Sequence, residues 1–464
     1  MADERSATDC VEGQLSQMEI SSSTQLPPLM VDSRTPQVFK GRRFFSMIAI
    51  LSCAFLDAID VGLLPASFKD LRLTFNMSIF WLGASDFSTS VFIGGFAFLW
   101  GKYSDRYPGM KLLKILCFLW GVSSLLVSVA SGPLYFFIVR ALSGIALGGF
   151  YPIKFGLVSD LVPNSHRGFY FSLLNVFSAL GHMCAGFLVA VTGSWRTSFR
   201  ITGLVCFGSA AFIAVVQAPI RGGGNYAPVS SKMPPQSLRE VAKIPTVWLS
   251  LCINLMFNIV KLSLHWLIFW LQLMGKNDMI AASISSVYLT GVLLGSLAGG
   301  ILSDVMHRHS PNYGRIVMLH VSEFVVFLCL LFLFNGGAAS TNSVLSLCLF
   351  AVGACTGWID FGVCKPMLLD VIGMSTRGLV IGFEHFIVKV TAAFIAGPLL
   401  GTVALDAGFG GIAPSNSTQR VANVAALQEG LQLVTMGAAV LAIGFTVPIY
   451  FTYKTDRVNS TIIS

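Results

Sequence analysis

Charged residues are scarce in this sequence. Of its 464 residues only 11% are Asp, Glu, Lys or Arg, whereas 54% are apolar. Soluble domains carry about a quarter of charged residues, so this chain cannot cover its surface in water and must lie largely in lipid. The net charge of +8 does not indicate nucleic-acid binding, because the basic residues are scattered singly at the ends of apolar runs. That is the positive-inside pattern of membrane proteins.

Signals for secretion, disulfide bonding, metal binding and catalysis are also lacking. The first forty or so residues are polar, which excludes an early signal peptide and indicates a disordered tail. The ten cysteines lie in that tail or within apolar runs, so we expect packing rather than disulfides. No Gly-x-x-x-x-Gly-Lys loop occurs, and His and Cys lack metal-site spacing. We therefore expect no enzyme, no catalytic residue, no metal and no cofactor.

Twelve apolar runs are long enough to cross about 30 Å of hydrocarbon. A basic segment rich in Gly, Pro and Ser, from Arg221 to Lys243, divides them equally and indicates a linker. We predict an all-α membrane protein with twelve transmembrane helices. The predicted parts are a tail at 1–43, a half at 44–219, a linker at 220–245, a second half at 246–452 and a tail at 453–464. The predicted spans are 44–66, 79–101, 111–131, 133–159, 167–191, 199–219, 246–272, 280–303, 315–335, 343–370, 377–404 and 429–452.

The orientation follows from the 30 lysines and arginines, most of which fall on the side of the N-terminus. Both termini are therefore predicted to be cytoplasmic. Two glycosylation sequons, at Asn76 and Asn416, fall in loops that this topology places outside, whereas a third, at Asn459, falls in the cytoplasmic tail. The choice between plasma membrane and a lysosome-like organelle stays open.

Two patterns of loop charges are repeated about two hundred residues apart. Gly101-Lys-Tyr-Ser-Asp105-Arg106 is matched by Gly300-Ile-Leu-Ser-Asp304. Asp160 with Arg167-Gly168 is matched by Asp370 with Arg377-Gly378, at the same interval. Two independent repeats indicate a duplicated six-helix unit.

At these residues the sequence resembles the major facilitator superfamily, whose loop signature runs Gly-x-x-x-Asp-Arg-x-Gly-Arg-Lys. Gly101, Asp105, Arg106, Gly109 and Lys111 answer to it, with Pro108 inserted and Met110 in place of a basic residue. In the second copy Val305 replaces the Arg, and Arg308 is expected to substitute. Arg140-x-x-x-Gly144-x-x-x-Gly148 is similar to another motif of the family.

The resemblance implies two six-helix bundles around a central cavity, with a cytoplasmic gate made by the loop charges. Simple positive-inside anchoring is the alternative explanation of these charges. The expected gate residues are Gly101, Asp105, Arg106, Asp160, Arg167, Asp304, Arg308, Asp370 and Arg377.

Within the superfamily the sequence resembles the spinster-like lipid transporters. The resemblance rests on Asp57 followed by Gly62-Leu-Leu-Pro65, and on Trp195-Arg-Thr-Ser-Phe-Arg200. It implies a lysophospholipid or sphingoid-type lipid as substrate. The anion–cation symporter branch has a similar Asp-to-Pro stretch, so a small organic anion or another hydrophilic metabolite is the alternative.

In this superfamily the spans at 44–66, 133–159, 246–272 and 343–370 line the cavity, and all four carry charge here. Charges inside spans are costly unless they are paired or hydrated. The expected substrate and proton cavity comprises Asp57, Asp60, Arg140, Tyr151, Lys154, Asn254, Asn258, Lys261, His265, Asp360 and Lys365.

Several of these residues have a structural alternative. Lys154 and Lys365 lie near the inner face and could snorkel there, Arg140 could be a clamp between helices, and His265 could be interfacial. Lys261 and Asp57 lie deeper and are expected to contact the cavity or each other. Asp86, Glu384, His385 and Lys389 either bridge the halves or form structural ion pairs.

These features predict a secondary carrier that works by alternating access and uses the proton gradient. Asp57 or Asp60 would bind the proton, while Lys261 and Arg140 would hold an anionic or zwitterionic group. A non-transporting receptor on the same fold is a further alternative. The expected partners are a small-molecule or lipid substrate and membrane lipid, without nucleic acid, and we expect a monomer.

Overall fold

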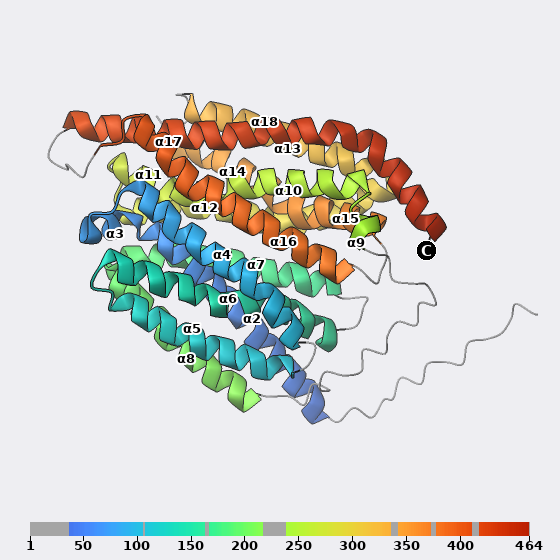
Figure 1. Ribbon diagram of the computed structural model, residues 1–464, viewed down its shortest axis with the longest axis horizontal. Helices are drawn as coiled ribbons and strands as arrows, with labels where there is room; N and C mark the ends of the chain where they lie inside the picture. Colours follow the sequence, from blue (N-terminus) through green and yellow to red (C-terminus); the bar gives the residue numbers. More distant parts are fainter. Residues whose placement is uncertain are drawn as a thin grey trace, which may run out of the picture. The chain divides into compact units, whose positions relative to one another are not determined.

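The computed structural model describes residues 37–104, 107–162, 167–216, 238–335, 342–372, 377–410 and 417–463. Contacts divide the chain into two compact units, Met1–Phe44 and Phe45–Ser464, and the spans described below lie in the second unit, apart from the start of the first one. Every regular element within the described ranges is a helix (Figure 1). The predicted all-α fold is therefore confirmed.

Within the described ranges, twelve helical segments are long and apolar enough to cross a membrane, as the sequence predicts. The first six, here the first half, are α2 (Gln37–Ala66), α4 (Ile79–Ser104), α5 (Gly109–Ser128), α6 (Pro133–Leu161), α7 (Arg167–Thr192) and α8 (Trp195–Val216).

The other six form the second half, and three of them are interrupted by a different helical turn. They are α10 (Pro245–Ser263) with η2 (Leu264–Trp266) and α11 (Leu267–Leu273); α12 (Asp278–His309); α13 (Gly314–Phe334); α14 (Asn342–Trp358) with η3 (Ile359–Cys364) and α15 (Lys365–Val371); α16 (Arg377–Phe394) with η4 (Ile395–Leu399) and α17 (Leu400–Asp406); and α18 (Ser417–Ile463). Two short helices, α3 (Phe68–Phe75) and α9 (Leu238–Val241), lie outside the spans.

Equivalent helix pairs pack in the two halves. Helix α4 packs on α6 and α5 on α8 in the first half, as α12 packs on α14 and α13 on α18 in the second. The halves meet where α4 packs against α16, η4 and α17, and where α7 packs against α12. The second span, which carries Asp86, thus packs against the eleventh, which carries Glu384, His385 and Lys389.

Glycine permits the closest of these approaches. A Cβ atom on Gly295 would lie 2.1 Å from the carbonyl oxygen of Ala354, so α12 could not approach α14 as it does. A Cβ atom on Gly83 would lie 2.3 Å from the carbonyl carbon of Gly397, at the seam between α4 and η4. Small residues allow this backbone contact where apolar burial cannot drive association in lipid.

Two π-helical turns interrupt the second half. The turn η3 lies between α14 and α15, and η4, which contains Pro398, lies between α16 and α17. A π turn holds an additional residue and is frequently found at functional sites. Here η3 contains Asp360 and directly precedes Lys365.

The last span is longer than the sequence predicts. Helix α18 continues to Ile463, whereas we expected a tail from residue 453. Side chains near its end explain the difference: Tyr453 donates a hydrogen bond to Asp370, Asp456 accepts one from the Thr246 hydroxyl, and Arg457 donates to the Pro311 carbonyl. These contacts with α15, α10 and the loop before α13 stabilise additional turns. The expected linker also contains α9, and residues 217–237 lie outside the described part.

Candidate functional site

An ion pair joins α2 to α6 in the first half. The Nζ of Lys154 lies 2.7 Å from Oδ2 of Asp57. The Lys154 side chain is only 6% exposed, and its Nζ lies 5.8 Å from the centre of the Phe150 ring, whereas Asp57 is 25% exposed. Lys154 therefore holds its ammonium group inside the protein instead of snorkelling. Asp57 and Lys154 were both expected in the cavity, but their pairing was not predicted from the sequence.

One turn along α2, Asp60 forms a second ion pair, which is almost completely buried. Nη1 of Arg140 lies 2.8 Å from Oδ2 of Asp60, and the two side chains are 2% and 1% exposed. The Trp120 indole donates to the other Asp60 oxygen at 3.2 Å, and the Arg140 guanidinium lies 5.5 Å from the Phe199 ring centre. This geometry favours the clamp over the hypothesis that Arg140 holds a substrate head group.

The second half contains a corresponding network around Glu384. Glu384 forms an ion pair with Lys365 and accepts a hydrogen bond from the Asn254 amide, so α16 is joined to α15 and α10. Asn258 extends the network by donating to Asn254 at 2.9 Å. The side chain of Glu384 is 4% exposed and that of Lys365 13%. Glu384 thus contacts its own half, whereas the sequence left open whether it bridges the two.

Aromatic rings link the halves beside these pairs. The rings of Tyr151 on α6 and His385 on α16 stack with 4.2 Å between centroids and 10° between planes. His182 on α7 and His265 on η2 lie 6.1 Å apart by the same measure.

The remaining cavity candidates are less closely defined. The charge of Lys389 acts on Asp86 across the seam between α16 and α4. Lys261 is half-buried on α10, and the side chain of Asp360 lies outside the described residues.

At one end of the spans, where α3, α11 and α17 lie (Figure 1), the short helix α3 attaches the first half to the second. We call this the α3 end. Lys69 forms a 3.0 Å ion pair with Asp278, and Arg72 donates to the Gly410 carbonyl at 3.0 Å while its guanidinium lies 4.5 Å from the Phe409 ring centre.

Electrostatics at the α3 end differ from those of free side chains. Burial lowers the pKa of Arg72 to about 10, so it stays charged near neutral pH. Burial and the negative charge of Asp278 raise the pKa of Asp70. Sequence reasoning missed these residues. Their signal is the short amphipathic run after the first span, whose residues Phe68 and Leu71 are buried.

At the opposite end, Arg315 is the cation that meets the acids of the second loop pattern. It lies 2.7 Å from Asp370 and 3.6 Å from Asp304, and Tyr453 donates to the same oxygen of Asp370 at 2.6 Å. Arg308, which we expected in this role, is exposed. Arg315 follows Gly314 at the start of α13, so this dipeptide corresponds to the Gly-Arg of the loop signature and was the signal to read.

The other expected gate residues are only partly visible. Gly101 lies in α4. Asp105 and Arg106, and the side chains of Asp160, Arg167 and Arg377, lie outside the described residues. Of the two sequons predicted to lie on the outer side of the membrane, Asn76 is exposed at the end of α3, and Asn416 lies beyond the described residues.

Twelve spans in two related halves, with ion pairs inside the protein, are the architecture of a membrane transporter. The chain belongs to the Major Facilitator Superfamily, whose sequence profile matches residues 50–397. It is accordingly an integral, multi-pass membrane protein of a family of transporters.

Similarity to individual proteins extends over different lengths. The hexuronate transporter of Bacillus subtilis is 26% identical over 359 residues, which cover 73% of this chain and 82% of that protein. Protein spinster of Drosophila melanogaster is 21% identical over 387 residues, which cover 78% of this chain and 62% of that protein. NiaP of Bacillus subtilis, named for niacin/nicotinamide transport, is 29% identical over 202 residues. That match covers 41% of this chain, and the chain spans only 47% of the length of NiaP.

Among solved structures, a bacterial homologue of the human lysosomal transporter Spinster, inward-facing and unoccupied, superposes with a TM-score of 0.73 at 14% identity. The superposition covers 89% of this chain and 98% of that one. At this identity the superposition shows only that the fold is shared. The spinster-like resemblance rests on the sequence match to Protein spinster.

Proposed function

We propose that the protein is a proton-coupled secondary transporter of an organic anion or zwitterion. The observation that carries the proposal is the Asp57–Lys154 pair, whose acid is partly exposed and whose cation is buried. The second half contains a similar ion pair, between Lys365 and Glu384. Each half thus supplies one lysine that is neutralised by a carboxylate.

The pair explains why proton and anion would travel together. With Asp57 ionised, Lys154 is neutralised by it. When Asp57 takes up a proton, Lys154 loses its partner and can bind the anionic group of a substrate. Proton binding and anion binding therefore favour each other, by the reciprocity of linked equilibria. With a monoanionic substrate the empty and the loaded site are both electrically neutral, which lowers the cost of carrying them through a medium of low dielectric constant.

The contacts at the α3 end support alternating access. The attachments of α3 hold the halves together at the α3 end, which the predicted orientation puts outside. Transport requires that they separate while the opposite end closes. Exposed pairs such as Lys69–Asp278 contribute about 1 kcal/mol or less, so they suit a contact that forms and breaks.

For the substrate, a small organic acid is the first candidate. The match to a hexuronate transporter, which covers 73% of this chain, supports it. A lysophospholipid or sphingoid-type lipid is the second candidate, supported by the resemblance to spinster over 78% of the chain. A hexuronate offers its carboxylate to Lys154, and a lysophospholipid offers its phosphate.

Uptake into proteoliposomes tests the proposal. Purified protein is given an inward proton gradient and either labelled glucuronate or labelled lysophospholipid, and uptake is compared with vesicles that lack a gradient. We expect gradient-driven accumulation of one class and its loss in Asp57→Asn, which retains exchange of labelled for unlabelled substrate. Accumulation that persists in Asp57→Asn would exclude this residue as the proton site. Binding of either ligand without any translocation would favour a receptor.

A further inference from the structure

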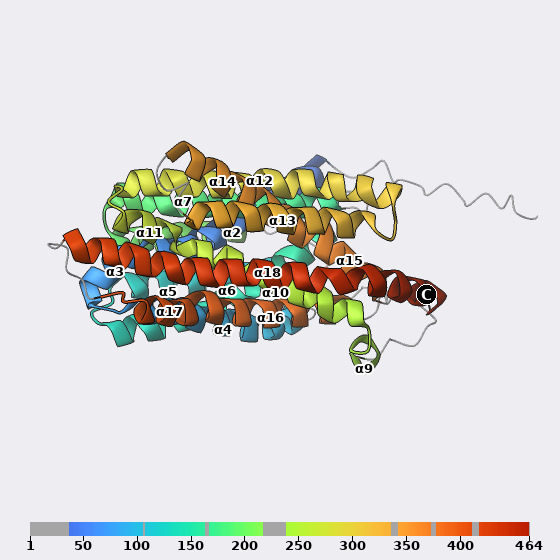
Figure 2. The ribbon, with the colours of Figure 1, turned by 90° about the horizontal axis from the view of Figure 1, so that it is seen from above.

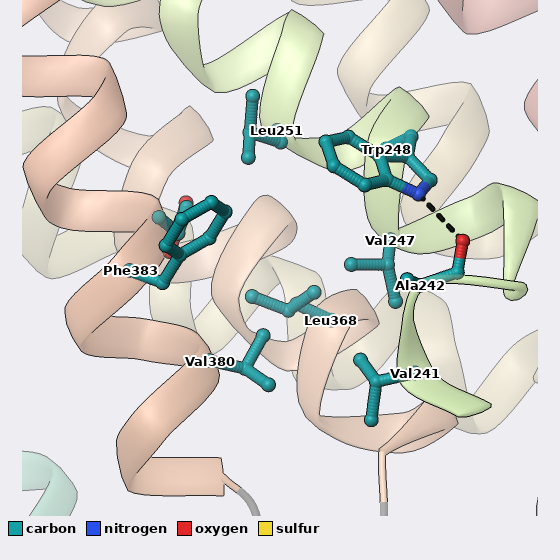
Figure 3. Close-up of a pocket in the computed structure, with 9 residues that line it drawn as sticks. Val241, Ala242, Val247, Trp248, Leu251, Leu368, Val380 and Phe383 are labelled. Carbon is teal, nitrogen blue, oxygen red and sulfur yellow. Dashed lines mark hydrogen bonds between the residues drawn. The ribbon is translucent and has the colours of Figure 1, made fainter. Parts of the chain in front are cut away.

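A pocket of about 210 Å³ lies at the end of the second half away from α3, between α9, α10, α15 and α16 (Figure 3). Its walls are apolar, and the lining includes Val241, Val247, Leu251, Leu368, Val380 and Phe383. Trp248 on α10 also lines it, and its indole nitrogen donates to the Ala242 carbonyl at 2.8 Å. The ion pairs that support transport in the first half do not line this pocket.

The mouth of the pocket has the composition of a membrane–water interface. Trp248 and Phe383 are 46% and 51% exposed. Arg239 on α9 and Lys243 just after it are exposed as well. Figure 2 shows α9 at the edge of the helices, beyond the end of α10. Tryptophan concentrates at the level of lipid head groups, and basic residues beside a span attract anionic lipids.

The deep end of the pocket reaches the polar network of the second half. Glu384 contributes to the lining, and its carboxylate is held by Lys365 and Asn254. The interior thus suits hydrocarbon.

Arg239 and Lys243 flank the lining residues Val241 and Ala242 in sequence and outnumber the one exposed acid between them, Glu240, so the charge there favours an anion. A free anion would leave the apolar walls without contacts, and a neutral lipid would not use Arg239 and Lys243.

We propose that this pocket binds one acyl chain of an anionic phospholipid, with its head group beside Arg239 and Lys243. The predicted orientation places this end on the cytoplasmic side, where anionic lipids concentrate. The bound chain would contact Phe383 and the buried face of Trp248 and end near Glu384. This site is separate from the Asp57–Lys154 pair and does not depend on the proposed transport.

Quenching of Trp248 fluorescence by brominated lipid tests the proposal. The protein is reconstituted in nanodiscs with phosphatidylglycerol or phosphatidylcholine brominated in the middle of the acyl chain. The chain has eight tryptophans, so the contribution of Trp248 is obtained by subtracting the signal of Trp248→Phe. Trp81 on α4, which is 52% exposed, serves as a matched reporter of ordinary boundary lipid through Trp81→Phe.

We expect the Trp248 component to be quenched at lower fractions of brominated phosphatidylglycerol than of phosphatidylcholine, and the Trp81 component to be quenched equally by both. Arg239→Gln with Lys243→Gln should weaken the preference about 25-fold, since each basic residue near the surface contributes about a factor of five. Val380→Phe should reduce quenching by both lipids because it fills the pocket. Its melting temperature, measured alongside, separates this effect from misfolding.

Two results would overturn the proposal. If both lipids quench Trp248 equally and Val380→Phe changes nothing, the residue touches only boundary lipid. If neither lipid quenches Trp248, the pocket is closed to lipid. Neither result affects the proton-coupled transport proposed above, which is measured independently.

Discussion

Asp60 and Arg140 form an ion pair at 2.8 Å in which neither side chain is more than 2% exposed, while Asp57, three residues earlier on α2, is 25% exposed. The two acids of α2 therefore have different surroundings. One carboxylate oxygen of Asp60 accepts from Arg140 and the other from Trp120, and the side chain is buried. Asp60 is therefore not placed to exchange a proton with solvent. Asp57 has one cationic partner and partial access. The structure thus separates a structural pair from the pair that we propose to carry the proton.

Removing one member of the buried pair should destabilise the protein more than removing both. Asp60→Leu or Arg140→Leu leaves a buried charge without a partner, at a cost of about 3–5 kcal/mol. The double variant removes both charges and should recover a large part of that loss. Thermal unfolding in detergent measures the three variants. Equal destabilisation by the single and double changes would contradict the clamp.

Lys154 should be needed for substrate, not only for stability. In Lys154→Gln, Asp57 is left without its cation, so both stability and binding should fall. Adding Asp57→Asn removes the unpaired charge and should restore the melting temperature. Substrate affinity should stay lower by about thirtyfold or more, since a lost contact with a buried charge is worth at least about 2 kcal/mol. Binding measured on the double variant at near wild-type affinity would show that Lys154 has only a structural role.

Arg315 should matter where Arg308 does not. Arg315→Gln leaves Asp370 and Asp304 without their shared cation, which we expect to cost about 1–3 kcal/mol because Asp370 is partly exposed. Arg308→Gln, four residues after Asp304, changes an exposed residue and serves as the control. Melting temperature and initial uptake rate should both fall for Arg315→Gln only. A larger effect of Arg308→Gln would show that Arg308, as expected from the sequence, supplies the positive charge of the gate.

The α3 end should respond to pH through Asp70. Its pKa is raised by burial and by Asp278, so the ionised form is the less favourable one in the folded protein. Asp70→Asn should therefore stabilise the protein at neutral pH, and the gain should vanish below about pH 4, where aspartate is protonated in the folded and unfolded chain alike. Because Asp70 is partly exposed, we expect less than about 1 kcal/mol. Melting temperatures at several pH values measure the difference.

Lys69→Gln is the matched control for Asp70→Asn. It removes the partner of Asp278 and should lower the melting temperature at neutral pH, opposite in sign to Asp70→Asn. If Asp70→Asn were neutral or destabilising at pH 7, the repulsion between Asp70 and Asp278 would be unimportant.

The spans could be predicted because lipid dictates their length and composition. The apolar runs gave all twelve, and errors are concentrated at ends such as that of α18, where Tyr453 and Arg457 extend the helix by side-chain contacts that hydropathy does not register. The duplicated loop charges identified the family for a similar reason, since their spacing is local in sequence.

The partners within the site could not be predicted in the same way. Asp57 and Lys154 are separated by almost a hundred residues, and their contact depends on how α2 and α6 are rotated against each other. Arg315 was missed because α12 runs on past Asp304 to His309, so Gly314 follows Asp304 by ten residues, whereas Gly109 follows Asp105 by four. Helix α3 was missed because it is too short to appear as a span.

The π turn η3 sets the direction of the lysine that follows it. One residue in a regular helix corresponds to a rotation of about 100°, and a π turn contains one residue more than an α turn. Lys365, directly after η3, therefore points in a different direction from the one that an unbroken helix would give it. Its counterpart Lys154 lies in α6, which has no such turn. The direction of Lys365 toward Glu384 therefore depends on the length of this span as well as on its side chains.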